Sequence, residues 1–223
     1  MREKTKAQPQ PPRVDFEPRA VSRLEPAGAE ELMAGDYREA ELFAGADVTE
    51  YDLAGCSFLE CRFASVTLTD AELRGSRFIE TVFDSTFAHS LKAARTTWRD
   101  VLIENPRWGS AELFDAELDS VHVRGGKIDY LNLRGSRLSN VVIEGCAITD
   151  LDLGGVTANR VALIDCRIGT LDTTGATLVN VDLRSSEFSA LHGLAGLAGA
   201  TIDDAQLTLF APWLAQHLGL RVE

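Results

Sequence analysis

Four cysteines are the side chains in this sequence best suited to hold a metal ion or to carry redox chemistry. Cys56 and Cys61 lie five residues apart, and Cys146 and Cys166 lie twenty apart. Zinc sites and redox pairs usually bring cysteines together in CxxC motifs, which this chain lacks, and no histidine shares the cysteine spacing. Free cysteine is commonly a small buried hydrophobic residue. We therefore expect all four to be core residues, with no metal or cofactor bound.

Histidines and carboxylates also lack a catalytic pattern. The histidines are scattered along the chain, and none lies in an HExxH, GxSxG or P-loop motif. Many acidic residues lie near one another, but a repeat in the sequence places them there, which is weak evidence for acid–base catalysis. We predict no catalytic residues and no enzymatic activity.

The element that must position these side chains is a repeat of five residues. Every fifth residue from Val48 to Phe188 gives 29 positions, of which 28 are apolar, against 45% for the whole chain. Two residues before each lies a second selected position, filled by small or β-branched residues such as Cys56, Val66 and Ala71. Because alternate residues of a strand point to one side, each unit predicts a three-residue strand with two inward side chains, followed by a corner.

A longer period of twenty is superimposed on the period of five. LRGSR occurs at 73–77 and again at 133–137. Glycine recurs at one corner position at intervals that are multiples of twenty: Gly55, Gly75, Gly135, Gly155 and Gly175. These glycines fit corners that need a positive φ. Four sides therefore form one coil, and coils about 4.8 Å apart pair through parallel strands in a β-solenoid.

The five-residue unit resembles the pentapeptide repeat, whose consensus is Ala-Asp/Asn-Leu-X-X. This chain shows the unit as ADVTE (46–50), AELRG (71–75), AELFD (111–115), AELDS (116–120), LNLRG (131–135), LDLGG (151–155) and VDLRS (181–185). The resemblance implies the all-β fold of that family, a right-handed quadrilateral parallel β-helix, over roughly residues 40–192. Ala88, Ala93 and Pro106 depart from the pattern, so we expect a distorted coil or a protruding loop within 84–108.

The sequence divides into four segments. Residues 1–12, which are rich in Pro and Gln, are predicted to be a disordered tail. Residues 13–45 are predicted to be an N-terminal capping segment, and 46–192 the pentapeptide-repeat β-helix. Residues 193–223 break the period and are predicted to be a C-terminal helical cap or a dimerisation element.

The predicted C-terminal helix has recognisable ends. Asp203 with Gln206 matches a capping box, Gly219 can end the helix, and Pro212 should kink it or start a second short helix. One face carries four large apolar residues: Leu207, Phe210, Leu214 and Leu218. Two interpretations remain open. The helix caps the last coil, or it forms a homodimer interface, as the resemblance suggests.

Composition and charge narrow the classes of function. The chain has no run of 18 apolar residues and no signal peptide, so we expect no membrane span and a cytoplasmic location. The net charge of −12 divides into −2 for residues 1–45 (9 acidic, 7 basic), −8 for 46–191 (22 and 14) and −2 for 192–223 (3 and 1). An acidic surface repels phosphates, so we expect no direct nucleic-acid binding. The charge either maintains solubility or attracts a basic partner.

Stacked coils arrange outward residues in columns, and one column is strongly acidic. It reads Asp52, Glu72, Lys92, Glu112, Asn132, Asp152 and Asp172. Neighbouring positions of the column stand about 5 Å apart, a spacing that approaches that of phosphates along a DNA strand, and five of the seven are acids. The resemblance implies a use for them, because some pentapeptide repeat proteins are DNA mimics that occupy the DNA-binding surface of type II topoisomerases, including gyrase. The alternative is that these acids merely follow the consensus and are partly neutralised by Arg74, Arg95 and Arg134.

A second outward column is apolar at its centre. It reads Arg62, Val82, Leu102, His122, Val142, Ala162 and Asp182. An exposed apolar stripe usually marks an interface, or is covered by another part of the same chain. Both remain open here: Val82, Leu102 and Val142 are a candidate interface for a partner or a second copy, or residues 13–45 cover them.

These observations together predict a non-enzymatic β-solenoid that acts through protein–protein contacts. The hypothesised partner is DNA gyrase or another type II topoisomerase. The alternative is a scaffold with an unrelated protein partner.

Overall fold

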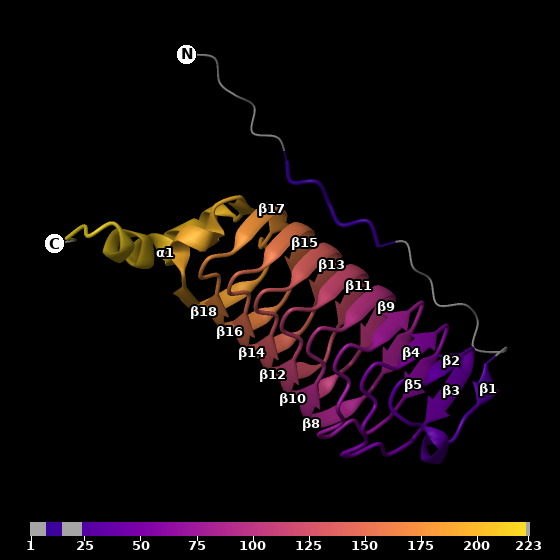
Figure 1. Cartoon of the computed structure of the whole chain (residues 1–223). Helices are drawn as coiled ribbons and strands as arrows, with labels where there is room; N and C mark the ends of the chain where they lie inside the picture. The colour runs from indigo at the N-terminus through magenta and orange to yellow at the C-terminus, as the bar shows by residue number, and fades with distance from the viewer. Residues whose placement is uncertain (1–7, 15–23, 222–223) are drawn as a thin grey trace.

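The computed structural model in Figure 1 describes residues 8–14 and 24–221. Parallel strands stack side by side along a rod, and a helix lies beyond the last coil. Equivalent residues of neighbouring coils are twenty apart, as in the pairing of Arg107 with Lys127. The fold is therefore the parallel β-solenoid that the two periods predict. The expectations for residues 1–7 and 15–23 lie outside the described residues, and the predicted segment boundaries stay predictions.

The strands are short and follow the five-residue units. Their bounds are β1 (Glu25–Pro26), β2 (Tyr37–Glu39), β3 (Glu41–Ala44), β4 (Ser57–Leu59), β5 (Arg62–Ala64), β6 (Arg77–Ile79), β7 (Val82–Asp84), β8 (Phe87–Lys92), β9 (Thr97–Glu104), β10 (Arg107–Glu112), β11 (Glu117–Arg124), β12 (Lys127–Asn132), β13 (Arg137–Glu144), β14 (Ala147–Asp152), β15 (Thr157–Ile164), β16 (Arg167–Asp172), β17 (Thr177–Asp182), β18 (Glu187–His192) and β19 (Ala200–Thr201). The helical elements are the 3-10 turns η2 (Ala29–Glu31) and η3 (Leu194–Leu197) and the α-helix α1 (Asp204–His217).

Two sheets divide the four sides of the coil between them. One sheet runs β18-β16-β14-β12-β10-β8, and the other includes β9, β11, β13, β15 and β17 in that order. Strands β9, β11, β13 and β15 are eight residues long because each continues round a corner and covers two sides. The outward residues of each side therefore form straight columns along the rod.

Corners adopt the left-handed backbone conformation that the glycine spacing predicts. Gly55 and Gly75 both have a φ of 70°, and Gly135 has 68°. Asparagine takes the same role at Asn140 and Asn180, each with a φ of 53°. Asparagine tolerates this region better than most residues, because its short polar side chain bonds locally.

The core is a stack of large side chains, one from each side of each coil. Phe58 lies flat on Phe78 with ring centroids 5.4 Å apart, and Trp98 follows at 4.4 Å from Phe78. Phe63 stacks on Phe83 in the same way, at 4.8 Å, on the adjacent side. These stacked rings occupy the inward positions that the period of five predicts.

Residues 84–108 form regular structure, so the expectation of a distorted coil or protruding loop was wrong. They comprise β8, β9 and the start of β10, all in register with their neighbours. Trp108 stands opposite Ala88 in the ladder. The small side chain leaves the volume that the indole needs, so two departures from the usual residue size compensate each other.

The second inward position carries hydrogen-bonding groups that join successive coils. The Ser76 and Ser136 hydroxyls donate to backbone carbonyls 23 residues earlier, at 2.7 and 2.8 Å. The thiols of Cys56 and Cys166 make the same contact at 3.2 and 3.3 Å. The cysteines are therefore core residues at a position that serine and threonine also fill.

Helix α1 closes the C-terminal end of the rod. Its capping box is present, since Gln206 N–H donates to Asp203 Oδ1 and the Asp203 N–H donates to Gln206 Oε1. Pro212 lies inside one continuous helix, so of the two expected outcomes, a kink or a second short helix, the second helix does not form. A proline costs one backbone hydrogen bond, and ring packing of Phe210 against Trp213 spans this point. Within the described residues, no helix is both long and apolar enough to cross a membrane.

Candidate partner-binding surfaces

The acidic column is a single ladder in the structure. Isolated bridges pair Asp52 with Glu72 and Glu72 with Lys92. Strands β8, β10, β12, β14 and β16 then continue the ladder through Glu112 to Asp152 and Asp172. Because coils stack without a shift in register, all five predicted acids face outward from one side of the rod.

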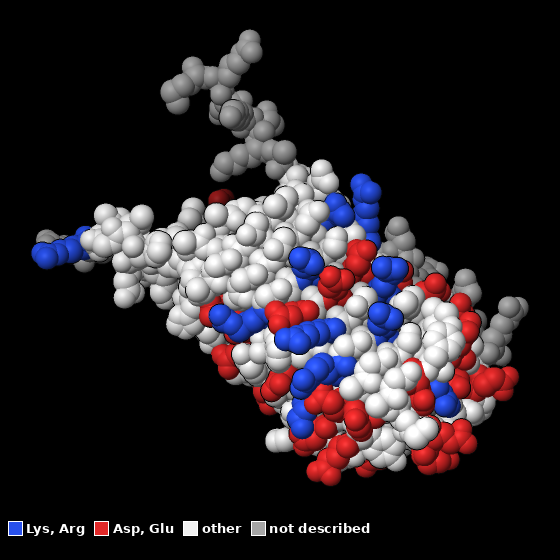
Figure 2. Space-filling view, viewed as in Figure 1, with Lys and Arg blue, Asp and Glu red and all other residues white. Residues whose placement is uncertain are grey.

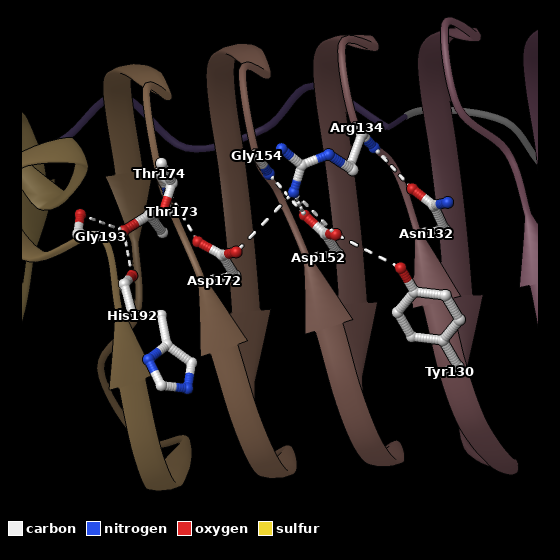
Figure 3. A network of polar contacts seen from close by, with 10 residues as sticks. All are labelled: Tyr130, Asn132, Arg134, Asp152, Gly154, Asp172, Thr173, Thr174, His192 and Gly193. Carbon is white, nitrogen blue, oxygen red and sulfur yellow. Dashed lines mark hydrogen bonds and ion pairs between the residues drawn. The ribbon is translucent and has the colours of Figure 1, made fainter.

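At the C-terminal end of this column an arginine bridges two of the acids, as Figure 3 shows. Arg134 Nη1 lies 3.0 Å from Asp152 Oδ2 and 3.8 Å from Asp172 Oδ2. The backbone N–H of Gly154 also donates to Asp152 Oδ1, at 2.8 Å, and Tyr130 donates its hydroxyl to Asp152 Oδ2 at 3.3 Å. Asp152 and Asp172 are therefore engaged within the chain.

Gly154 provides the space for this bridge. A Cβ at Gly154 would lie 2.5 Å from Arg134 Nη1, so a larger residue would displace the guanidinium. Partial burial raises the pKa of Asp172, but hydrogen bonds from Thr174 and the charge of Arg134 outweigh it and hold this pKa below its usual value. The hydrogen bond to Asp152 raises the pKa of Arg134.

The N-terminal part of the column is less neutralised. Arg74 Nε lies 3.6 Å from Glu72 Oε1, and Lys92 Nζ forms an ion pair with Asp70 Oδ1 at 3.7 Å. Asp52 is exposed and accepts the Ala54 N–H at 3.1 Å. In the described part of the chain, no cation lies within ion-pair distance of Asp52 or of Glu112.

Acidic charge is concentrated at the N-terminal end of the rod. The net charges of residues 1–45, 46–191 and 192–223 do not reveal this, because the boundary at residue 45 divides the acidic region. Residues 24–84 carry 14 acidic and 4 basic side chains, a net charge of −10. Residues 85–192 carry 14 acidic and 11 basic side chains, a net charge of −3. Figure 2 shows acidic side chains crowding the end that holds β1 to β5, whereas the visible surface over β15, β17 and α1 is largely uncharged. Counting charge coil by coil would have shown this.

The apolar column is mostly inaccessible. Val82 is 4% exposed and Leu102 9%, although both point outward from the coil. Val142 is half-buried. Residues 8–14 run beside this column at its C-terminal end, where Arg13 N–H donates to Asn140 Oδ1. The three residues therefore do not form an open patch.

Some apolar residues of α1 face the last coil, and others face solvent. Phe210 is buried and packs against Phe188, with ring centroids 6.0 Å apart. Leu214 is half-buried, whereas Leu207 is 50% exposed and Leu218 70%. The helix thus docks on the last coil through part of its apolar surface and presents the rest to solvent.

The four cysteine sulfur atoms lie in the core of the solenoid. All four cysteines are buried and free, and no group of three or more metal-ligating side chains comes together in the region that the structure describes. Burial raises the pKa of Cys61 to about 11. A hydrogen bond with Cys166 and burial raise the pKa of Cys146. These raised pKa values disfavour the thiolate at Cys61 and Cys146, whereas the same hydrogen bond with Cys146 lowers the pKa of Cys166.

The fold and its outward ladders define the class of protein: a four-sided parallel β-solenoid with acidic surface columns. Residues 43–83 match the model of the pentapeptide repeat family, with eight copies. The same five-residue unit continues in register beyond the matched residues, as far as β18.

Solved structures of this kind resemble the chain at low identity. A trypsin-treated form of QnrB1, a plasmid-mediated fluoroquinolone resistance protein, is 18% identical with a TM-score of 0.48, covering 86% of this chain and 93% of that chain. HetL, a pentapeptide repeat protein involved in heterocyst differentiation regulation from the cyanobacterium Nostoc sp. strain PCC 7120, is 13% identical with a TM-score of 0.29, covering 79% and 94%. A search of curated protein sequences gave no significant match.

Proposed function

We propose that this protein acts without catalysis, in the cytoplasm, as an acidic DNA mimic that binds a type II topoisomerase such as gyrase. The observation that carries the proposal is the charge of the N-terminal coils. The sequence resemblance to pentapeptide repeat proteins supplies the partner class. The contact surface is centred on Asp52 and Glu72 in these coils and extends along the same column to Glu112, because an arginine inside the chain already engages Asp152 and Asp172.

Charge density supports this assignment. Residues 24–84 span about three coils, or about 14 Å along the axis at about 4.8 Å per coil. Their net charge of −10 gives about one negative charge per 1.4 Å, close to the value of about one per 1.7 Å for duplex DNA. Residues 85–192 carry −3 over about 26 Å. Only the N-terminal coils therefore have a charge density close to that of the DNA that a topoisomerase binds.

A gyrase supercoiling assay tests the proposal. We expect the purified chain to inhibit supercoiling, or to protect gyrase from quinolones, at micromolar concentration. The triple variant Asp52→Asn, Glu72→Gln and Glu112→Gln should weaken the effect about tenfold, because it removes charge from the contact surface. Added salt should weaken the wild-type effect more than that of the variant.

A matched control separates the surface from net charge. The triple variant Asp150→Asn, Asp165→Asn and Glu187→Gln removes the same charge from exposed positions outside the N-terminal coils. We expect it to inhibit as the wild type does. A wild-type chain that neither inhibits nor protects gyrase would refute the proposal, and equal losses in both variants would refute the assigned surface.

The exposed leucines of α1 support a second proposal, that two copies associate through this helix. Leu207, Leu209 and Leu218 are each at least 50% exposed, and exposed apolar clusters favour interfaces. Light scattering should show a dimer that the variant Leu207→Glu with Leu218→Glu converts to a monomer. A wild-type monomer at all concentrations would overturn this proposal.

The alternative function, a scaffold for an unrelated partner, would use the apolar column. Burial of Val82 and Leu102 favours the acidic surface over this alternative. Substituting Val142, the more accessible member, by Glu should leave gyrase inhibition unchanged. A loss of other co-purifying proteins in that variant would favour the scaffold.

A further inference from the structure

A proline-rich segment near the N-terminus lies against one corner of the solenoid. Gln10 N–H donates to Asn180 Oδ1 and Arg13 N–H donates to Asn140 Oδ1, both at 3.2 Å. These contacts join residues 170 and 127 positions apart in the sequence. Figure 1 shows the segment as an indigo trace that runs along the rod beside β17, β15 and β13.

The segment uses all the backbone donors that it has at this site. Pro9, Pro11 and Pro12 carry no N–H. Between Pro9 and Arg13 only Gln10 and Arg13 can donate, and both do. The pattern of prolines therefore agrees with the pattern of acceptors on the corner.

The two asparagines are oriented to receive these donors. Asn140 donates its Nδ2 to Asp119 Oδ1 of the preceding coil at 3.0 Å, and Asn180 donates to Asn159 Oδ1 at 3.4 Å. Each amide nitrogen donates to the solenoid, so each amide oxygen can accept from residues 8–14. Arg160, on the corner between them, donates its Nε to the same Asn140 oxygen at 2.7 Å, which further fixes that side chain.

The spacing of the corner matches polyproline II. Asn140 and Asn180 lie two coils apart, about 9.6 Å at about 4.8 Å per coil. Three residues of a polyproline II helix rise about 9.3 Å, and successive turns present every third residue to one side. One turn of such a helix therefore spans two coils, and donors three residues apart meet acceptors two coils apart.

Apolar side chains border this corner on both sides. Val179 is 51% exposed on one side, and Ala162 lies at the end of the apolar column on the other. Grooves that recognise proline-rich segments combine apolar contact with a few hydrogen bonds, because the polyproline II helix is already ordered before it binds.

We propose that the corner formed by Asn140, Arg160 and Asn180 is a docking surface for a proline-rich segment of a partner protein, with non-proline residues three apart. The chain's own residues 8–14 occupy it as the resident competitor. A partner segment binds by displacing them, which gives the solenoid a second contact surface, independent of the acidic column.

Amide hydrogen exchange of the full chain tests the resident contact. We expect the amides of Gln10 and Arg13 to exchange at least about tenfold more slowly than in an unfolded peptide. Asn180→Gly should remove protection at Gln10, and Asn140→Gly at Arg13, since glycine keeps the positive φ of each corner. Asn105→Gly, at a corner with a φ of 49°, is the matched control and should change neither. Unprotected amides in the wild type would overturn the proposal.

Peptide binding tests the partner surface. The double variant Gln10→Pro with Arg13→Pro removes both donors and favours a polyproline II backbone, since proline fixes φ near the value of that helix. A labelled peptide with the sequence AQPQPPRV should bind this variant at least about tenfold tighter than the wild type, whose tethered segment competes at high effective concentration. Adding Asn140→Gly and Asn180→Gly to the variant should abolish binding, with circular dichroism unchanged.

Three outcomes would overturn this docking surface. One is a peptide that does not bind the double variant, and another is equal binding with and without the two asparagines. The third is a concentration-dependent dimer in which a second copy supplies residues 8–14, which would assign the corner to self-association.

Discussion

At the scale of single residues, the surface charge of this protein depends on which neighbours a long side chain can reach. Arg134 lies across the ladder to Asp152 and Asp172 because Gly154 leaves its path open. The consensus places acids in this column, but it does not say which are paired. The column therefore divides into a bridged C-terminal part and a more open N-terminal part.

Replacing Arg134 should show how much this bridge lowers the pKa of Asp172. In Arg134→Gln we expect the pKa of Asp172 to rise toward its ordinary value, because a nearby cation that favours the carboxylate is lost. Carboxyl titration by NMR measures this change. Arg137→Gln, whose guanidinium pairs with Glu117 at 3.3 Å on another side, is the control and should leave that pKa unchanged.

The same bridge has a defined pH dependence. The folded-state pKa of Asp172 is lowered, so its contribution to stability is present above the unfolded pKa of about 3.9 and is lost as pH falls below it. Wild type and Arg134→Gln should therefore differ at pH 7 and converge near about pH 2–3. The difference should stay below about 1 kcal/mol, because Arg134 is half-exposed. Urea unfolding at the two pH values measures it, and a difference that grows in acid would contradict the prediction.

At the scale of elements, one buried amide joins α1 to the last coil in addition to the packing of Phe210. Gln206 Nε2 donates to the carbonyls of Leu183 and Ser186, both at 2.7 Å. Its Oε1 caps the start of the same helix. One side chain therefore couples the capping of the helix to its docking.

Removing this amide should undock the helix. Gln206→Ala removes the amide donor from the carbonyls of Leu183 and Ser186, and we expect a loss of about 2–3 kcal/mol in the stability of the docked end. Hydrogen exchange in residues 204–217 should accelerate while β9 to β13 stay protected. Gln216→Ala, at an exposed position of the same helix, should have little effect. Unchanged exchange in Gln206→Ala would show that Phe210 alone holds the helix.

At the scale of the whole molecule, one column of core residues changes from aromatic in the N-terminal coils to aliphatic in the later coils. Phe58, Phe78 and Trp98 stack in successive coils, whereas Leu138, Ala158 and Leu178 occupy the same positions further along. In a solenoid each coil is stabilised chiefly by its neighbours. The two ends can therefore open independently.

A cavity at one end should loosen that end first. Phe78→Ala removes a buried ring that contacts both neighbouring coils, and we expect a loss of about 3–5 kcal/mol. Hydrogen exchange should accelerate more in residues 40–100 than in 140–190. Leu178→Ala should give the opposite distribution. A uniform acceleration in both variants would mean that the rod unfolds as one cooperative unit.

The candidate site was only partly predictable from sequence. The ladder through Asp52, Glu72 and Glu112 could be derived, because twenty-residue coils bring these residues into line. The bridge at Arg134 depends on the free volume above Gly154. The corner occupied by residues 8–14 has no local signal, since Gln10 and Asn180 lie at opposite ends of the chain. The burial of Val82 and Leu102 also could not be read from their outward direction.

By itself the sequence determined the four-sided solenoid, the inward and outward sets of side chains, and the columns in which outward residues stack. It could do so because side-chain direction in a strand follows the backbone period, and a corner with positive φ every fifth residue leaves little freedom of register. Only the tertiary structure decided which charges are paired, which apolar residues are covered and where residues 8–14 lie. Those outcomes depend on space and contacts between residues far apart in the chain, which no local periodicity encodes.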